Sequence, residues 1–147
     1  MNKFSELAHA ASIELNVSAS VAFDFLSDPL QLGQWALGCR DIRKNKDDYS
    51  GFSIFTGEQS DFNISASREL LLIDYLLGEP GKFKPRISAR IVDSDTYGAM
   101  KDHCLVTLLA WRGKSMSDQR WHQLCVCHET EVFLLKGLLE GDRENSL

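Results

Sequence analysis

Apolar and polar side chains alternate along much of the chain, which is the pattern of strands with one buried face. The alternation is clearest at residues 11–17 and 86–92. From residue 37 to residue 112, short segments of this kind follow one another with little room for helix, which favours an antiparallel meander. The pattern predicts seven strands, at residues 11–17, 37–43, 51–56, 61–68, 70–77, 86–92 and 102–112.

Two short helices are predicted between the first strand and the second. Ser18 can cap a helix over residues 19–26, because a serine side chain accepts a hydrogen bond from the backbone of the first helical turn. Asp28 followed by Pro29 is a second start signal, since proline is favoured at the first helical position. We expect this second helix to end near Trp35.

The C-terminal region changes from the period of a strand to the period of a helix. Residues 119–140 contain no proline, and Gly137 is their only glycine. At about 100° per residue, one stripe collects Trp121, Leu124, Cys125, His128, Val132, Leu135 and Leu139. Ser115 and Asp118 have the spacing of a capping box at the start of this region. The pattern therefore predicts a long amphipathic helix.

The composition is that of an ordinary globular protein and excludes several classes. The 147 residues are 44% hydrophobic and 25% charged, and no linker or repeat divides them, which indicates one domain over residues 1–147. No apolar run reaches the length of a membrane span. The N-terminus lacks a secretory signal, so we expect a cytoplasmic protein with its four cysteines reduced. The net charge of -5 argues against a nucleic-acid partner.

The element order is a strand, two short helices, six strands and one long helix. This order, together with the sequence of residues 13–29 and Trp35, resembles the START-like (SRPBCC) superfamily, which includes polyketide cyclases and lipid-transfer domains. The resemblance implies an α+β fold in which a curved, seven-stranded antiparallel sheet grips the C-terminal helix. It also implies a deep cavity between sheet and helix that binds a small hydrophobic or aromatic molecule.

His128 is the first candidate for chemistry. It lies in the middle of the helix stripe, one turn from both Leu124 and Val132, and should therefore point into the cavity. A histidine there can act as a general acid or base, because its ordinary pKa suits proton transfer near neutral pH. The alternative is a core histidine that is bonded to a strand carbonyl or a buried water.

Asp74 and Tyr75 are the second candidates, and only one of them can point into the cavity, because neighbouring residues of a strand face opposite sides. Asp74 interrupts the apolar strand at residues 70–77, where an unpaired carboxylate would be costly to bury. It could orient His128 or bind a substrate group, or it could point out of the sheet. Tyr75 could donate to a ligand oxygen from the opposite face. Both faces of this strand are apolar, so the pattern does not decide which residue points inward.

Other candidates come from the neighbouring strands. Arg68 has the parity of an inward-facing residue and could bind an acidic ligand group, whereas Arg86 and Arg90 are expected to face solvent. His103 and Thr107 share one face of the last strand, and they lie near the cavity only if that face is concave. The remaining candidates are apolar or aromatic cavity walls: Trp35, Tyr75, Trp111, Trp121, Leu124 and Val132.

No metal or cofactor is expected. Val132 stands where the zinc-protease helix motif requires its second histidine. Cys125 and Cys127 point about 200° apart on a helix, which prevents shared metal ligation. Glu129 and Glu131 lie on opposite flanks of the helix stripe and do not form a carboxylate pair with one another.

The leading hypothesis is a domain that binds a small hydrophobic or aromatic molecule, with cofactor-free acid–base chemistry of the cyclase, dehydratase or other lyase type. His128 and Asp74 would be its catalytic residues. A non-catalytic carrier and a chaperone-activator-like interaction module remain open as alternatives. The two apolar faces of residues 70–77 and 104–111 also predict that the sheet's outer face is covered by a second copy in a homodimer.

Overall fold

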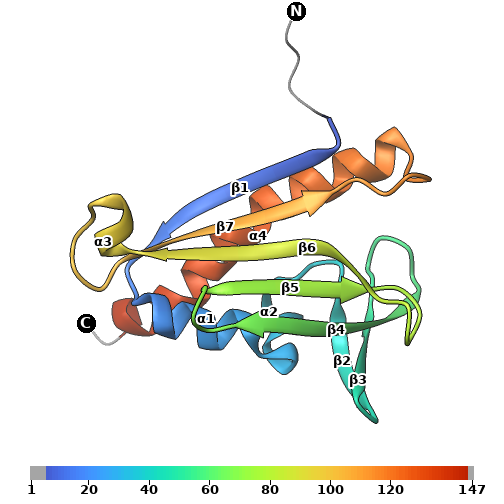
Figure 1. The fold of residues 1–147 in the computed structure, drawn as a ribbon, viewed down its shortest axis with the longest axis horizontal. Helices are drawn as coiled ribbons and strands as arrows, with labels where there is room; N and C mark the ends of the chain where they lie inside the picture. Colours follow the sequence, from blue (N-terminus) through green and yellow to red (C-terminus); the bar gives the residue numbers. More distant parts are fainter. Residues whose placement is uncertain (1–5, 146–147) are drawn as a thin grey trace, which may run out of the picture.

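The computed structural model describes the backbone of residues 6–145 and the side chains of residues 6–141. Figure 1 shows the elements in chain order: β1 (Ala8–Leu15), α1 (Ala19–Ser27), the 3-10 helix η1 (Pro29–Gln31), α2 (Leu32–Trp35), β2 (Arg40–Asn45), β3 (Asp48–Phe52), β4 (Gln59–Ser67), β5 (Leu72–Leu77), β6 (Lys84–Asp93), α3 (Ser94–Tyr97), β7 (Cys104–Trp111) and α4 (Asp118–Asn145). No helix in this described part is long and apolar enough to cross a membrane.

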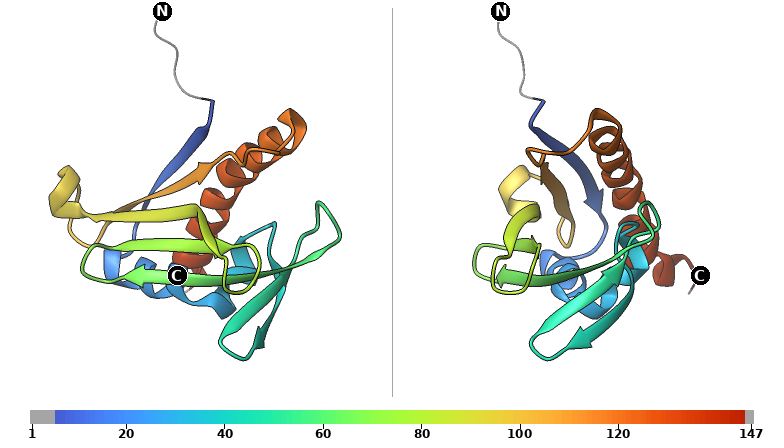
Figure 2. Two further views of the ribbon diagram at one scale, coloured as in Figure 1. Left: turned by 45° about the vertical axis from the view of Figure 1, so that its right-hand side comes forward. Right: turned by 90° about the vertical axis from the view of Figure 1, so that its right-hand side faces the viewer.

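The seven strands form one antiparallel sheet in the order β1-β7-β6-β5-β4-β3-β2. The first strand therefore pairs with the last, from Ala8 opposite Trp111 to Leu15 opposite Cys104. The sheet curves around α4, which contacts β1, β7 and α2 (Figure 2). The predicted α+β fold, with a curved seven-stranded sheet and a long C-terminal helix, is confirmed.

Alternation along the central strands decides which side chains face α4. On β5, the buried Ile73 and Tyr75 lie opposite Ala89 and Ile87 of β6. On β7, the buried residues of the same face are Cys104, Val106, Leu108 and Ala110. Successive side chains of a strand point to opposite faces, so the residues between these positions lie on the outer face of the sheet.

The helix starts show which local predictions were right. Ser18 caps α1 as predicted, and its Oγ accepts a hydrogen bond from the Val21 amide at 3.2 Å. The predicted capping box at Ser115 is wrong, because the amide of Met116 donates to the Gly113 carbonyl and forms a turn there. The helix begins two residues later, where Ser117 Oγ accepts from the Arg120 amide at 3.2 Å.

Two other segments differ from the prediction. The strand expected at residues 51–56 ends at Phe52, because the chain turns back through a loop in which the Ser53 amide donates to the Glu58 carbonyl. The short helix α3 was not predicted at all. It is capped by Asp93 and ends at Gly98, whose φ of 76° is favourable for glycine.

Candidate functional site

A cavity of about 550 Å³ opens between the inner face of the sheet and α4. Its wall is built by α2, the β3–β4 hairpin, the strands β4 to β6 and the first half of α4. This volume lies in the range of small-molecule sites. The wall is mostly apolar in area, as in such sites, and most of its polar side chains come from the β3–β4 hairpin and from α4.

Glu131 is the most unusual of these polar groups. Its side chain on α4 lines the cavity and is only 5% exposed. The backbone amide of Leu37 donates a hydrogen bond to Glu131 Oε2 at 2.8 Å. Burial raises the pKa of this carboxyl from 4.5 to about 7, against a smaller lowering effect of the Leu37 hydrogen bond. The carboxyl therefore exchanges its proton near neutral pH.

His128 lies one helical turn before Glu131 and lines the same cavity. Its Nε2 is 3.9 Å from Glu131 Oε1, which is too long for a hydrogen bond. Burial, together with a smaller effect of the nearby His9, lowers the pKa of His128 from 6.5 to about 4. His128 is therefore neutral at pH 7, and its Nδ1 has no hydrogen-bond partner among the residues that the structure describes.

Tyr75, Trp35 and Cys39 also bring polar atoms to the cavity wall. The Tyr75 hydroxyl donates to the Leu26 carbonyl at 2.8 Å, so it already has a partner. Trp35 packs edge-on against Tyr75, and its buried Nε1 has no hydrogen-bond partner in the described part of the chain. Cys39 holds a thiol whose pKa is raised to about 12 by burial and by the charge of Glu131, so it is not a nucleophile at neutral pH.

The comparisons with known proteins agree with this geometry. A START superfamily protein from Mycobacterium smegmatis superposes with a TM-score of 0.67 at 14% identity, over 92% of this chain and 98% of that one. The Zhui aromatase/cyclase from Streptomyces sp. R1128 gives 0.64 at 10% identity, over 94% and 93%. The Aha1 dimer from Colwellia psychrerythraea gives 0.64 at 15% identity, over 91% and 96%. The fold is START-like.

At these identities the similarity is one of fold. No family model matches the chain, and no curated protein matches it in sequence. The START-like fold accounts for the position of the cavity, whereas the chemistry of the cavity depends on this chain's own residues.

The START-like cavity brings together four of the residues expected from the sequence. They are Trp35, Tyr75, Leu124 and His128. Val132 is buried in the core beneath them and is absent from the cavity wall. Trp121 is half-buried on α4 and is also absent from this wall.

Asp74 does not lie with His128. Tyr75 points into the START-like cavity, so Asp74 faces the outer surface of the sheet. There Asp74 lies opposite Ser88 of β6, whose hydroxyl donates a hydrogen bond to it. The expectation that Asp74 orients His128 is thereby corrected.

Arg68 is also placed outside the cavity. β4 ends at Ser67, so the strand parity that predicted an inward direction no longer applies to Arg68. Its exposed guanidinium pairs with Asp24 of α1 and lies 4.7 Å from the centre of the Phe23 ring. These contacts fasten the β4–β5 turn to α1.

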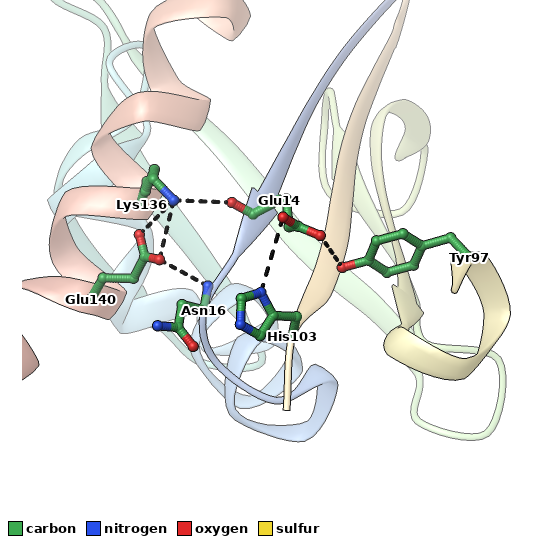
Figure 3. Close-up of polar contacts among 6 residues, drawn as sticks. All are labelled: Glu14, Asn16, Tyr97, His103, Lys136 and Glu140. Carbon is green, nitrogen blue, oxygen red and sulfur yellow. Dashed lines mark hydrogen bonds and ion pairs between the residues drawn. The ribbon is translucent and has the colours of Figure 1, made fainter. Parts of the chain in front are cut away.

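The face of β7 that carries Thr107 and Trp111 is the outer face. The hydroxyls of Thr107 and Ser12 share a hydrogen bond of 2.7 Å between β7 and β1. Trp111 is 42% exposed at the end of its strand. His103 precedes β7, and its Nδ1 lies 4.0 Å from Glu14 in a polar cluster beside α4 (Figure 3). Thr107 and His103 therefore lie away from the cavity.

Glu131 is the cavity residue that the sequence analysis missed. The signal was available, because residues three apart on a helix share a face, and Glu131 follows His128 by three. Glu129, two residues before Glu131, is exposed and pairs with His9 on β1. Among the described residues, no three His, Cys, Asp or Glu side chains come together as a metal site.

Proposed function

We propose that this chain binds a small hydrophobic or aromatic molecule in its START-like cavity and transforms it by cofactor-free acid–base chemistry, as a cyclase, dehydratase or other lyase. The observation that carries the proposal is the buried Glu131 carboxyl, with a pKa of about 7, beside the neutral His128. A general acid–base group is most effective when its pKa lies near the working pH.

Two polar groups of the cavity, on Glu131 and His128, have roles in this proposal. The Glu131 carboxylate removes a proton from the carbon beside a ligand carbonyl. A ring N–H of His128, which lines the cavity, donates to the oxygen, which takes up the negative charge. In a dehydration, the enolate then expels the β-hydroxyl, which takes the proton from Glu131 and leaves as water.

The test uses 2-tetralone, a bicyclic aromatic ketone with acidic protons beside its carbonyl. The wild-type protein should accelerate the exchange of these protons with D₂O, followed by NMR. Glu131→Gln should still bind the ketone but exchange its protons at the rate of buffer alone. The control is Glu69→Gln, the same change at an exposed site in the β4–β5 turn, which should exchange like the wild type.

A non-catalytic carrier is the second candidate, and the mostly apolar cavity wall favours it. A carrier should bind 2-tetralone, as seen by quenching of tryptophan fluorescence, with no acceleration of exchange in any variant. If the wild-type protein bound no 2-tetralone, both the enzyme and the carrier proposals would be contradicted.

We also propose a cytoplasmic homodimer. All four cysteines are free thiols, as in proteins of a reducing compartment. The outer face of the sheet carries the half-buried residues Leu72, Leu76, Leu105 and Leu109, and one solved structure with this fold is titled as an Aha1 dimer.

A further inference from the structure

A second hollow adjoins the cavity at the end of the sheet. It is a groove of about 780 Å³ between the β5–β6 loop and the loop that joins β7 to α4. Both loops lie at the right-hand end of the molecule in Figure 1. Its floor and sides include Lys82, Lys84, Arg86, Trp111 and Arg120.

The groove exists because the sheet parts between β6 and β7. Lys84 and Pro85 pair with β5, whereas the pairing of β6 with β7 begins only at Ile87 opposite Ala110. The start of β6 therefore extends beyond the point where β7 leaves it. Gly113 lies in the loop after β7, and a Cβ there would come within 3.1 Å of an Arg86 guanidinium nitrogen. The missing side chain at Gly113 lets Arg86 lie along the groove.

The charge of the groove is opposite to that of the whole chain. The chain carries a net charge of -5, yet the charged residues that line the groove are Lys82, Lys84, Arg86 and Arg120, with Glu79 as the one acidic residue. Glu79 lies 4.0 Å from Lys82, and Arg120 donates to the neutral side chain of Gln123. Within the described residues, Lys84 and Arg86 have no acidic partner.

The groove and the cavity share one apolar wall. Leu77, Ile87 and Leu124 line both hollows, and so do the charged residues Glu79 and Arg120. The two hollows are therefore adjacent, and an apolar strip joins them beside these two charged side chains.

The cavity suits an anion less well than the groove does. Its lining has the carboxyl groups of Glu58, Asp61, Glu79 and Glu131 against the one cation Arg120, whereas the groove has four cations against Glu79 alone. An anionic group of a ligand would therefore be repelled from the cavity and attracted into the groove.

We propose that the ligand is an elongated amphipathic anion, with its hydrophobic or aromatic body in the cavity and a carboxylate or phosphate group in the groove at Lys82, Lys84, Arg86 and Arg120. This rests on the proposed function, and it adds the substrate class. Lysine and arginine bind both kinds of anion through charge-assisted hydrogen bonds. Anchoring the anionic end would also fix which part of the body reaches Glu131.

The test compares three fluorescent probes that share one body: 6-(2-naphthyl)hexanoate, 6-(2-naphthyl)hexan-1-ol and the phosphate monoester of this alcohol. The variant Lys84→Gln/Arg86→Gln removes two charges from the groove. The control Arg43→Gln/Lys44→Gln removes two exposed charges from β2, whose residues line neither hollow. Both double variants therefore have the same net charge.

The wild type should bind the hexanoate or the phosphate at least tenfold more tightly than the alcohol, and 0.3 M NaCl should reduce this preference. The groove variant should lose at least fivefold in affinity for the anion and less than twofold for the alcohol, whose unchanged binding shows that the variant is folded. The control variant should behave like the wild type. The more tightly bound anion identifies the head group.

Equal binding of the anions and the alcohol by the wild type would overturn the anion groove and leave the cavity proposal standing. The groove assignment would also be overturned if both double variants lost affinity equally, because only the net charge would then matter. If no probe were bound, the anion groove and the cavity proposal would fail together.

Discussion

At the scale of single residues, the buried pair of Glu131 and His128 is distinctive because burial acts on both members in the direction of neutrality. It raises the pKa of Glu131 to about 7 and lowers that of His128 to about 4. Between these two values, neither group carries a charge in the folded protein. Near pH 7, small changes in pH alter the charge of Glu131, while His128 stays neutral.

The first prediction concerns the pH dependence of catalysis. If the Glu131 carboxylate is the base, the rate of 2-tetralone proton exchange should rise about tenfold per pH unit below pH 7 and level off above it. The level part begins at about 7 because that is the pKa of the group. NMR exchange rates from pH 5 to pH 9 measure the profile. A profile that levels off near pH 4.5 would assign the reaction to an exposed carboxylate.

The second prediction concerns stability. The folded pKa of Glu131 lies above its unfolded value of 4.5, so the folded state binds the proton more tightly. The stability that this provides is present below pH 4.5 and is lost as pH rises to about 7. Above pH 7 the buried charge costs about 3 kcal/mol. Glu131→Gln keeps an acceptor for the Leu37 amide and should therefore raise the free energy of unfolding by about 2 to 3 kcal/mol at pH 8, but hardly at pH 4.5.

Urea unfolding of the wild type and of Glu131→Gln at the two pH values measures this difference. His128→Gln is the matched comparison. The folded pKa of His128 lies below 6.5, so its burial costs stability only as pH falls from 6.5 to about 4. Its replacement should therefore increase stability more at pH 4.5 than at pH 8. Equal effects of Glu131→Gln at both pH values would contradict the raised pKa.

The site could be predicted from the sequence only as far as helix periodicity reaches. The stripe of α4 identifies His128 correctly as a cavity residue, and the same spacing could have identified Glu131. The orientation of Asp74 could not be predicted, because both faces of its strand are apolar. It is decided by the register with β6, where Tyr75 lies opposite Ile87 and Asp74 opposite Ser88. Register depends on residues distant in sequence.

At the scale of elements, the last turns of α4 are held by a polar cluster at the end of β1 (Figure 3). Lys136 Nζ donates to the Glu14 carbonyl at 3.2 Å and pairs with Glu140 at 2.8 Å. The backbone amide of Asn16 donates to Glu140 Oε1 at 2.8 Å. Burial alone would raise the pKa of Glu140, but the hydrogen bonds from Lys136 and Asn16 lower it below 4.5. The cluster therefore joins the last turns of α4 to the end of β1.

The third prediction follows from this cluster. Glu140→Gln should lower the free energy of unfolding by about 1 kcal/mol at pH 7. The folded pKa of Glu140 lies below the unfolded value, so its stabilisation is present above pH 4.5 and is lost as pH falls further. Amide hydrogen exchange should accelerate in residues 136–145 while the middle of α4 stays protected. Exchange that is unchanged in these turns would show that the cluster does not anchor the helix.

Element types could be predicted more reliably than element ends. All seven strands were expected, some from alternation and others as short apolar runs between turns, and both are signals that a strand carries within its own sequence. The ends depend on contacts with other segments, and several observed ends differ from the predicted ones. β3 ends at Phe52 because Ser53 begins a loop closed by Glu58, and α4 begins after a turn at Gly113. No local sequence pattern predicts where the pairing of β6 with β7 ends, although this end of the pairing creates the groove.

At the scale of the whole molecule, the sheet has two apolar faces, and α4 covers one of them. The outer face carries Leu105 and Leu109 on β7 and Leu72 and Leu76 on β5, all half-buried. Trp111 is 42% exposed on the same face. None of the described elements covers these side chains, which lie in two groups, with Ser88 and Arg90 of β6 between them on the same face. Exposed apolar groups of this kind are typical of an interface.

The last prediction is that two copies associate through this outer face. Sedimentation velocity at tens of micromolar should show a dimer, and Leu105→Glu/Leu109→Glu should shift it to monomer, because charges on an apolar interface lose their hydration without gaining a partner. Affinity for 2-tetralone should be unchanged, since both side chains point away from the cavity. The control Thr130→Glu adds a charge to the exposed side of α4 and should leave the dimer intact. If the wild type sedimented only as a monomer at these concentrations, the prediction would be contradicted, and the apolar side chains of the outer face would need another explanation.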